Sequence, residues 1–222
     1  MLYIVATPIG NLKDVSLRAL EVLKSVNLIA AEDTRHTRKL LAHYDIHTPL
    51  TSYFEHNSLA KGPYLVRLLQ EGKQIALVSD SGTPGISDPG YRLIELVIAN
   101  GIALTVIPGP TALIGALVVS GLPSDRFVFE GYLPVKAGAR KKKIAELSEQ
   151  TATVICYESP YRVLKSLQDL ADLLGEREIV IVRELTKKFE EIVRGSAQAV
   201  LAHFTSHAPQ GEFVIVIRGK GK

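Results

Sequence analysis

The chain contains 222 residues, of which 46% are hydrophobic and 22% are charged, and its formal net charge at pH 7 is +3. Such a composition is typical of a soluble globular protein with one large domain or two small ones. The single cysteine, Cys156, excludes an intrachain disulfide, and no secretory leader opens the chain, so we expect a cytoplasmic protein. The longest apolar runs stop at about a dozen residues, short of the roughly 20 that a membrane-spanning helix needs, and we expect no membrane contact.

The first half of the chain alternates apolar runs with helical patterns. Strands are predicted over residues 2–6, 28–31, 50–53, 74–79 and 103–107. Helices are predicted over residues 17–26, 34–41, 58–72, 89–100 and 111–121. Because the strands are continuously apolar, the pattern indicates a parallel sheet with helices on both faces.

Polar and proline residues predict where three of these helices begin. Asp14 or Ser16 is expected to cap the first helix. Asn57 is a candidate cap for a third helix that begins at Ser58, but Gly62-Pro63 favours a start at Pro63. The fourth helix is expected to begin at Pro89, because proline is favoured at the first helical position. Asp88 is then the expected cap of the fourth helix.

The regular alternation of predicted strands and helices changes near Pro123. We place a domain boundary there, between residues 1–122 and 123–222. Strands are predicted in the second part over residues 126–131, 152–157, 178–184, 190–196 and 211–219, with helices between most of them. The third and fourth of these strands are close enough in sequence to pair as neighbours. The chain is therefore expected to be an α/β protein of two domains, the second a mixed sheet with flanking helices.

Four loops of the first half follow strands of the predicted parallel sheet and are richer in polar residues and glycine than a connection requires. They are "ATPIGN", "EDTRHT", "SDSGTPGISDPG" and "PGPT". The carboxyl ends of parallel strands meet at one edge of a sheet, where ligands bind, so the loops together predict a pocket. Taken singly, Asp88 and Asp33 are also explained as helix caps.

Other motifs that would identify a site are absent. The sequence has no P-loop, no glycine spacing of a dinucleotide fingerprint and no G-x-S-x-G elbow. His43 and His47 lie four residues apart without the further ligands of a zinc site, and we interpret them as surface residues. Cys156 lies inside an apolar strand and is expected in the core.

The positive surplus lies in the second part of the chain. Residues 1–123 carry 10 basic and 10 acidic side chains, whereas residues 124–222 carry 16 and 13. Much of the surplus is the run "KAGARKKK", which contains Arg140, Lys141, Lys142 and Lys143. The run is either the solvated start of a helix or a patch that contacts the phosphates of a nucleic acid.

Seven segments together resemble the ribosomal RNA small subunit methyltransferase I family, which belongs to the tetrapyrrole methylase fold class. They are "LYIVATPIGNLKD", "AEDTRHTRKLL", "IALVSDSGTPGISDPG", "PGPTALIGAL", "GLPSDRFVFEGYLP", "YESPYR" and "RELTK", in order from Leu2 to about Arg218. The resemblance implies a homodimeric enzyme that transfers a methyl group from S-adenosylmethionine to the ribose 2'-hydroxyl of a cytidine in the decoding region of 16S rRNA. It leaves open whether free rRNA or the assembled 30S subunit is the substrate, and it implies no metal.

By the same resemblance, the cofactor binds in a cleft between two α/β domains. The implied contacts are Ile9, Ser79, Asp80, Gly82, Thr83, Ile86, Thr111, Ala112, Tyr157, Val182 and Phe213. Many members continue into a small helical extension, whereas this sequence ends at "VIRGKGK".

A ribose hydroxyl is a poor nucleophile while protonated, so transfer to it needs a base. Asp33 and Glu32 are the carboxylates expected nearest the site, and Arg35 and Lys187 are expected to hold flanking phosphates, Lys187 as part of the catalytic set. The basic run from Arg140 to Lys143 is expected to bind RNA.

Two other hypotheses about the function remain open. A tetrapyrrole or other small-molecule methylase on the same fold would need the cofactor site but neither the basic run nor the "EDTR" and "RELTK" segments. An RNA-binding module that has lost catalysis would not bind S-adenosylmethionine.

Overall fold

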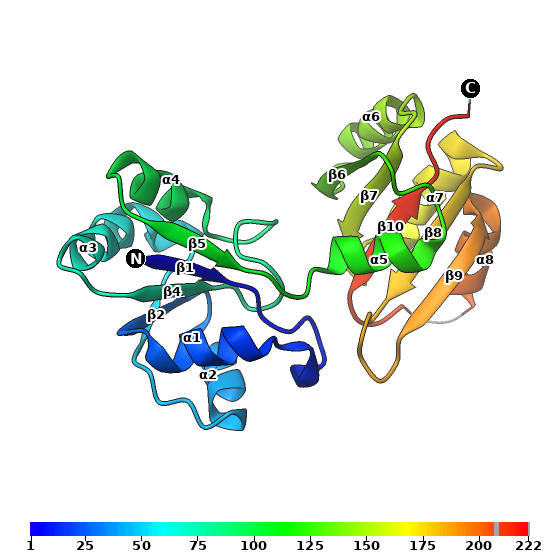
Figure 1. Cartoon of the computed structure of the whole chain (residues 1–222). Helices are drawn as coiled ribbons and strands as arrows, with labels where there is room; N and C mark the ends of the chain where they lie inside the picture. Colours follow the sequence, from blue (N-terminus) through cyan, green and yellow to red (C-terminus); the bar gives the residue numbers. More distant parts are fainter. Residues whose placement is uncertain (207–208, 222) are drawn as a thin grey trace. The chain divides into compact units, whose positions relative to one another are not determined.

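The computed structural model describes residues 1–206 and 209–221. The chain divides into two compact units, Met1–Thr111 and Ala112–Lys222, which are described separately (Figure 1). This division comes one helix earlier than the boundary expected near Pro123. The reason is that the intervening helix, α5 (Ala112–Ser120), packs against strands of the second unit.

The first unit is built on a five-stranded parallel sheet in the order β3-β2-β4-β1-β5. The strands are β1 (Leu2–Val5), β2 (Leu28–Ala31), β3 (Leu50–Ser52), β4 (Ile75–Val78) and β5 (Leu104–Ile107). The helices are α1 (Leu17–Ser25), α2 (Thr34–His43), α3 (Ser58–Gln70) and α4 (Tyr91–Ala99), with short 3-10 turns at Leu12–Asp14 and Glu55–Asn57. The predicted parallel sheet is confirmed.

Separate apolar clusters line the two faces of this sheet. One joins the sheet to α3 and α4 through residues such as Leu65 and Leu93. The other joins it to α1 and α2 through residues such as Leu23 and Leu41. The continuous apolar strands follow from this arrangement, because both faces of every central strand are buried.

The structure confirms the predicted cap of α1 but not the predicted starts of α3 and α4. Ser16 caps α1, its Oγ accepting a hydrogen bond from the Ala19 N–H at 3.1 Å. The expected start of α3 at Pro63 is wrong, because Pro63 lies inside a helix that begins at Ser58. Helix α3 approaches α4 so closely at Gly62 that a Cβ there would lie 2.8 Å from a Leu96 methyl, so tertiary packing holds the helix together across the proline.

The start expected for α4 at Pro89, with Asp88 as its cap, is also wrong. The helix begins at Tyr91, and Gly90 with φ 154° is its N-cap. A Cβ at Gly90 would lie 3.0 Å from the Gly85 nitrogen, because the preceding loop folds back on itself here. Asp88 and Pro89 are therefore part of the loop.

The second unit is a mixed sheet, as predicted, and its strand order is β6-β7-β10-β8-β9. Its strands are β6 (Phe127–Tyr132), β7 (Thr153–Glu158), β8 (Glu178–Arg183), β9 (Glu191–Ser196) and β10 (Phe213–Ile217). Strands β6 and β7 are parallel and the other neighbours antiparallel, including the predicted β8–β9 pair. Besides α5, the helices are α6 (Ala137–Ser148), α7 (Val163–Leu174) and α8 (Ala197–Thr205).

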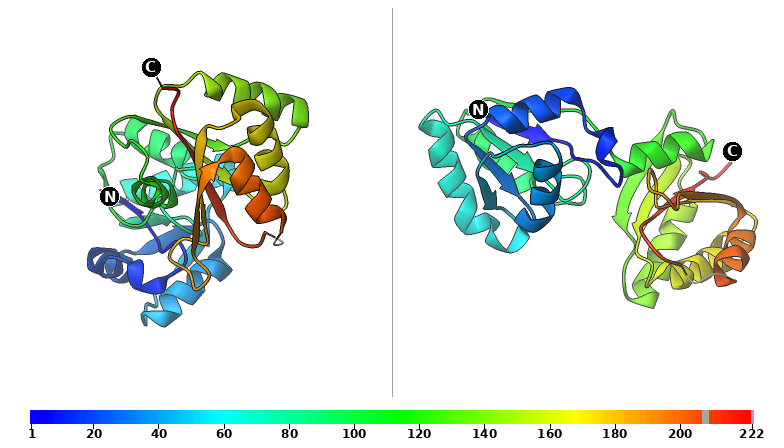
Figure 2. Two further views of the ribbon diagram at one scale, coloured as in Figure 1. Left: turned by 90° about the vertical axis from the view of Figure 1, so that its right-hand side faces the viewer. Right: turned by 90° about the horizontal axis from the view of Figure 1, so that it is seen from below.

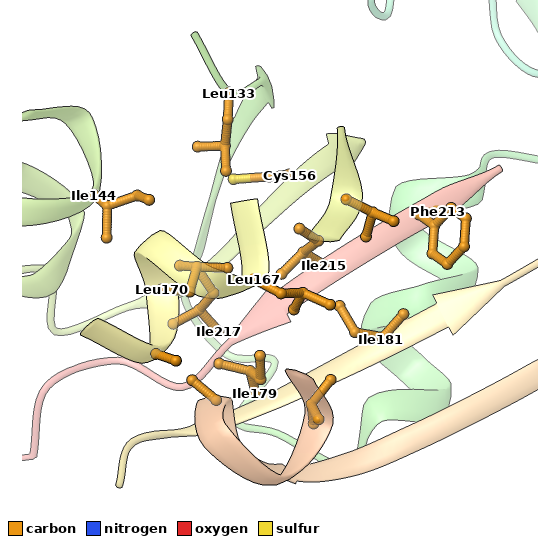
Figure 3. Close-up of a cluster of buried hydrophobic side chains, with 14 of the residues drawn as sticks. Leu133, Ile144, Cys156, Leu167, Leu170, Ile179, Ile181, Phe213, Ile215 and Ile217 are labelled. Carbon is orange, nitrogen blue, oxygen red and sulfur yellow. The ribbon is translucent and has the colours of Figure 1, made fainter. Parts of the chain in front are cut away.

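Helices α6, α7 and α8 cover one face of the second sheet, and α5 covers the other. The right-hand view of Figure 2 shows α5 (green) and α8 (orange) on opposite sides of these strands. The core under α6 to α8 contains Cys156, which is fully buried as expected, close to Leu133 (Figure 3). Across the described residues, no helix has the length and apolar character needed to cross a bilayer.

Candidate active site

The loops after β1 and β4 cross at the carboxyl edge of the first sheet. The two strands are neighbours, but the chain leaves β1 toward β2 and leaves β4 toward β5, on opposite sides. Thr7 and Gly82 form a two-way backbone bridge, Thr7 N to Gly82 O at 2.9 Å and Gly82 N to Thr7 O at 3.0 Å. A crossing of this kind is the place where open α/β sheets bind ligands.

Glycine makes the crossing possible at two positions. Gly82 has φ 79°, a left-handed conformation that residues with a side chain adopt at a cost. Gly109, after β5, passes so near the first loop that a Cβ would lie 2.9 Å from the Ala6 Cβ. The Thr83 hydroxyl donates to the Pro110 carbonyl at 3.4 Å. The segments 6–11, 79–90 and 108–111 therefore form one connected structure, which we call the rim.

A third loop, after β2, joins the rim through carboxylates. The Asp33 N–H donates to Asp80 Oδ1 at 3.0 Å, and the Asp80 N–H donates to Glu32 Oε2 at 3.3 Å. Strands β2 and β4 are neighbours, so this reciprocal pair ties the ends of adjacent strands together. Three carboxylates thus gather at one place, with Arg35 as the nearby cation that pairs with Asp33.

The carboxylates differ in how readily they accept a proton. Burial, opposed by the Asp80 N–H and reinforced by the negative charges of Asp80 and Asp33, raises the pKa of Glu32 above its usual range. Hydrogen bonds from the Arg35 side chain and backbone N–H lower the pKa of Asp33 to about 2. Asp33 also caps α2, its Oδ1 accepting from the Arg35 N–H at 2.8 Å. Glu32 is therefore the stronger base of the two.

The other first-unit residues of the predicted cofactor set also lie on or beside the rim. Ser79 is buried and its hydroxyl donates to the Ser81 carbonyl at 3.2 Å, so it shapes the loop. Ile9 lies beside Gly82, its Cγ2 3.5 Å from where a Cβ of that glycine would be. Ile86 is 39% exposed, a large side chain to leave in water. Thr111 ends the first unit.

In the second unit, Lys187 lies in a strained turn between β8 and β9. Glu184 and Thr186 have φ values of 50° and 66°, which are unusual for residues with side chains, above all for β-branched threonine. The buried Thr186 hydroxyl makes no hydrogen bond within the described residues. Such strain and unpaired polar atoms cluster at functional sites. Thr186 lies in the "RELTK" segment, but its residue type does not predict this conformation.

The Lys187 ammonium bonds to Glu184 Oε1 at 2.8 Å and to Glu212 Oε2 at 2.9 Å. Burial alone would lower the pKa of Lys187, but the two carboxylates outweigh it and the pKa is raised. Lys187 is therefore positively charged at neutral pH. It cannot serve as a base, and the two carboxylates together outweigh its positive charge.

Three predicted cofactor residues lie on the second sheet, but they do not share a face. Tyr157 and Val182 both pair with Val214 and lie on the face that α5 covers, as does Ala112. Phe213 points to the opposite face, where its ring packs 5.7 Å from that of Phe204. The side chains of Phe213 and Val214 face opposite ways because successive residues of a strand do so, and the cofactor contact of Phe213 stays a prediction.

The basic run at the start of α6 is more engaged than its sequence implies. Arg140 is 5% exposed; its Nε bonds to Asp169 at 2.7 Å and its Nη1 to the Val135 carbonyl at 3.1 Å. Lys141 lies 3.5 Å from Asp169, and Lys143 bonds to Glu130 at 3.0 Å. The expected RNA contact of Arg140 does not fit this burial, whereas Lys142 is exposed.

Within the described residues, no cluster of three or more histidine, cysteine, aspartate or glutamate side chains is arranged to hold a metal ion.

Comparison with known proteins identifies the family of the chain. The family described as tetrapyrrole (corrin/porphyrin) methylases matches residues 1–201. Proteins named ribosomal RNA small subunit methyltransferase I are 52% identical in Synechocystis sp. and in Vibrio cholerae, over 99% of this chain and 79% and 77% of theirs. The chain belongs to this family of tetrapyrrole methylases. The family member from Thermotoga maritima is 45% identical, over 99% of this chain and 98% of its own.

Solved structures show the same fold at low sequence identity. Uroporphyrin-III-C-methyltransferase from Thermus thermophilus superposes with a TM-score of 0.67 at 21% identity, covering 97% of this chain and 93% of its own. Cobalt precorrin-4 methyltransferase superposes with a TM-score of 0.71 at 16% identity, covering 98% and 94%. The overall fold of the chain is therefore the one shared by these methyltransferases.

Proposed function

We propose that this protein transfers a methyl group from S-adenosylmethionine to the ribose 2'-hydroxyl of a cytidine in the decoding region of 16S rRNA. The observation that carries the proposal is the similarity to bacterial proteins named ribosomal RNA small subunit methyltransferase I. The chain is identical to them at about half of its positions, over nearly its whole length. We further propose that it acts in the cytoplasm as a homodimer, on free 16S rRNA or on the 30S subunit.

The rim suits S-adenosylmethionine, which supplies an electrophilic methyl on a positively charged sulfonium. Three carboxylates, Glu32, Asp33 and Asp80, lie together with one cation between them, so their excess negative charge favours a cationic ligand. Glycine at position 82 lets backbone approach a ligand closely, and half-buried Thr83 offers a hydroxyl.

We assign to the cofactor the rim residues Ile9, Ser79, Asp80, Gly82, Thr83, Ile86 and Thr111. Ser79 acts by shaping the loop through its bond to Ser81. Of the second-unit residues, Ala112, Tyr157 and Val182 stay predicted contacts on the α5 face of the sheet.

Methyl transfer to a hydroxyl requires alignment and removal of a proton. Orientation of the reacting atoms contributes about 7 to 11 kcal/mol in such reactions. We assign proton acceptance to Glu32, because burial raises its pKa, whereas the Asp33 carboxylate is held in its weakly basic form by Arg35. Asp33 then acts as a positioning residue, since it caps α2 and its N–H holds Asp80.

Arg35 supplies positive charge for RNA phosphates, and Lys187 stays a predicted phosphate contact. Arg35 is mostly exposed and bonds Asp33 through one edge of its guanidinium, which leaves donors free for a phosphate. The Lys187 ammonium is already shared between two carboxylates, so it contacts an anion only as part of that cluster.

The decisive experiment is methylation of naked 16S rRNA and of 30S subunits with cofactor labelled in its methyl group, followed by mapping of the label. Label on one cytidine ribose is the expected result. Absence of label from both substrates, in a preparation that binds S-adenosylmethionine by calorimetry, would refute the RNA assignment and favour a small-molecule methylase.

A matched pair of variants distinguishes the role of Glu32 from that of Asp33. Glu32→Gln should lower kcat by about 10²- to 10⁴-fold. Asp33→Asn keeps an acceptor oxygen for the helix cap and should lower kcat less. The reverse order would transfer the base to Asp33.

A further inference from the structure

Three large side chains stand exposed on neighbouring loops of the second unit. Tyr161, in the turn between β7 and α7, is 91% exposed, and Tyr132, at the end of β6, is 55% exposed. Val135, in the connection from β6 to α6, is 72% exposed. We call these three residues the platform; they lie at the end of β6, in the connection from β6 to α6 and in the turn from β7 to α7, and Figure 1 labels these elements. Exposed aromatic residues that gather at one place commonly mark a binding surface.

The turn that carries Tyr161 is held by an almost fully buried carboxylate. Glu158 accepts from the Ser166 hydroxyl at 2.6 Å and from the Ser159 N–H at 2.8 Å. Its Oε1 pairs with the Arg162 guanidinium at 2.7 Å. Tyr161 therefore projects into solvent from a turn that hydrogen bonds and an ion pair hold on both sides.

The segment that carries Tyr132 and Val135 is also held in place, by a buried side chain and by hydrogen bonds to its backbone. Leu133, between them, is buried in the core beside Cys156 (Figure 3). The Leu133 carbonyl accepts from Arg162 Nη1 at 3.3 Å. The Val135 carbonyl accepts from the buried Arg140. Two arginines, each neutralised by a carboxylate, thus hold this backbone so that Tyr132 and Val135 face outward.

Arg162 also joins the two loops at their surface. Its guanidinium carbon lies 5.6 Å from the centre of the Tyr132 ring, within the range of a cation–π contact. The Tyr132 ring in turn meets the Tyr157 ring edge-on, with centroids 5.8 Å apart. The platform therefore adjoins Tyr157, one of the predicted cofactor contacts.

Two exposed lysines follow Val135 in the chain. Lys136 follows Val135 directly and is exposed, as is Lys142 on the next turns of α6, and neither forms an ion pair within the part of the chain that the structure describes. Tyrosine rings offer faces on which unpaired bases stack, and nearby cations contact the connecting phosphates. A purely apolar partner would need no such cations.

We propose that Tyr161 and Tyr132 stack unpaired bases of the RNA substrate, with Lys136 and Lys142 contacting its phosphates. The inference rests on the proposed function and adds to it the surface that receives the single-stranded part of the substrate. It also explains the otherwise unfavourable exposure of Tyr161.

Binding of a fluorescent 16S decoding-region RNA, measured by anisotropy at fixed salt, tests the platform. Tyr161→Leu and Tyr132→Leu keep apolar area but remove the ring, and each should weaken binding by about 5- to 100-fold. Tyr161→Phe keeps the ring and should bind within about twofold of the unaltered protein. Tyr64→Leu, an exposed tyrosine of the first unit that lies beside Lys61, is the matched control and should change nothing.

The outcomes separate the platform from the function. Tyr161→Leu and Tyr132→Leu variants that bind RNA as tightly as the unaltered protein, while that protein methylates 16S rRNA, would overturn the platform alone. A loss shared equally by Tyr161→Phe would also overturn it, because stacking would not be the cause. An unaltered protein that neither binds nor methylates the RNA would overturn both proposals. Tyr161 is almost fully exposed, so its variants test the platform even if Tyr132→Leu destabilises the fold.

Discussion

The buried pair Arg140–Asp169 divides the basic run of α6 into structural and exposed parts. Replacing Arg140 by methionine keeps most of the side-chain volume but leaves the Asp169 carboxylate buried without its main partner. Breaking a buried pair from one side costs about 3 to 5 kcal/mol. We expect the low end, about 3 kcal/mol, because the Lys141 ammonium remains 3.5 Å from Asp169.

Thermal and urea unfolding of the purified protein measure this cost. For a domain of this size, a loss of about 1 kcal/mol moves Tm by about 4 to 8 °C, so Arg140→Met should lower the Tm of the second unit by about 12 °C or more. The exposed Lys142→Ala is the control and should shift stability by less than about 0.5 kcal/mol. Lys142→Ala should instead reduce the salt slope of RNA binding by roughly 0.7 to 0.9.

A double variant isolates the cause. Arg140→Met combined with Asp169→Leu removes both charges, and a buried pair replaced by apolar residues is often close to neutral, so most of the lost stability should return. If Arg140→Met unfolds like the unaltered protein, the buried pair is not a stabilising contact. If the double variant is no more stable than the single one, the cost arises elsewhere, for example at the Val135 carbonyl.

Three further predictions concern the active site and the core. If Glu32 is the base, kcat should rise with pH through its raised pKa, above the ordinary value of about 4.3, because only the ionised carboxylate accepts a proton; a pH–rate profile of Glu32→Gln that kept this acid limb would contradict the assignment. Gly82→Ala and Gly72→Ala both force a side chain into a left-handed conformation, at about 1 to 2 kcal/mol each by urea unfolding, but only the first should weaken cofactor binding in calorimetry, and equal affinities would remove Gly82 from the site. Burial raises the pKa of Cys156 to about 12, so iodoacetamide at pH 8 should label the thiol in guanidinium but not in the folded protein, as mass spectrometry would show; rapid native labelling would place Cys156 outside the core.

Local sequence patterns determined much of the fold. Continuous apolar runs predict the strands of the first sheet because both of its faces are covered, and Ser16 caps α1 because its short hydroxyl reaches the free N–H groups of the first turn. The resemblance of several loop motifs to one methylase family was likewise visible in the sequence, because those loops retain their residues. These features could be predicted because each depends on residues that are close together in the sequence.

Only the tertiary structure decided which of the chemically similar residues is suited to which task. Glu32 and Asp33 are adjacent carboxylates, yet burial raises the pKa of one and Arg35 lowers that of the other. Arg140 and Lys142 stand in one basic run, yet Asp169, 29 residues away along the chain, takes the first into the interior. The burial of Glu32 and the Asp169 partner of Arg140 are set by segments distant in sequence, so a local pattern cannot specify them.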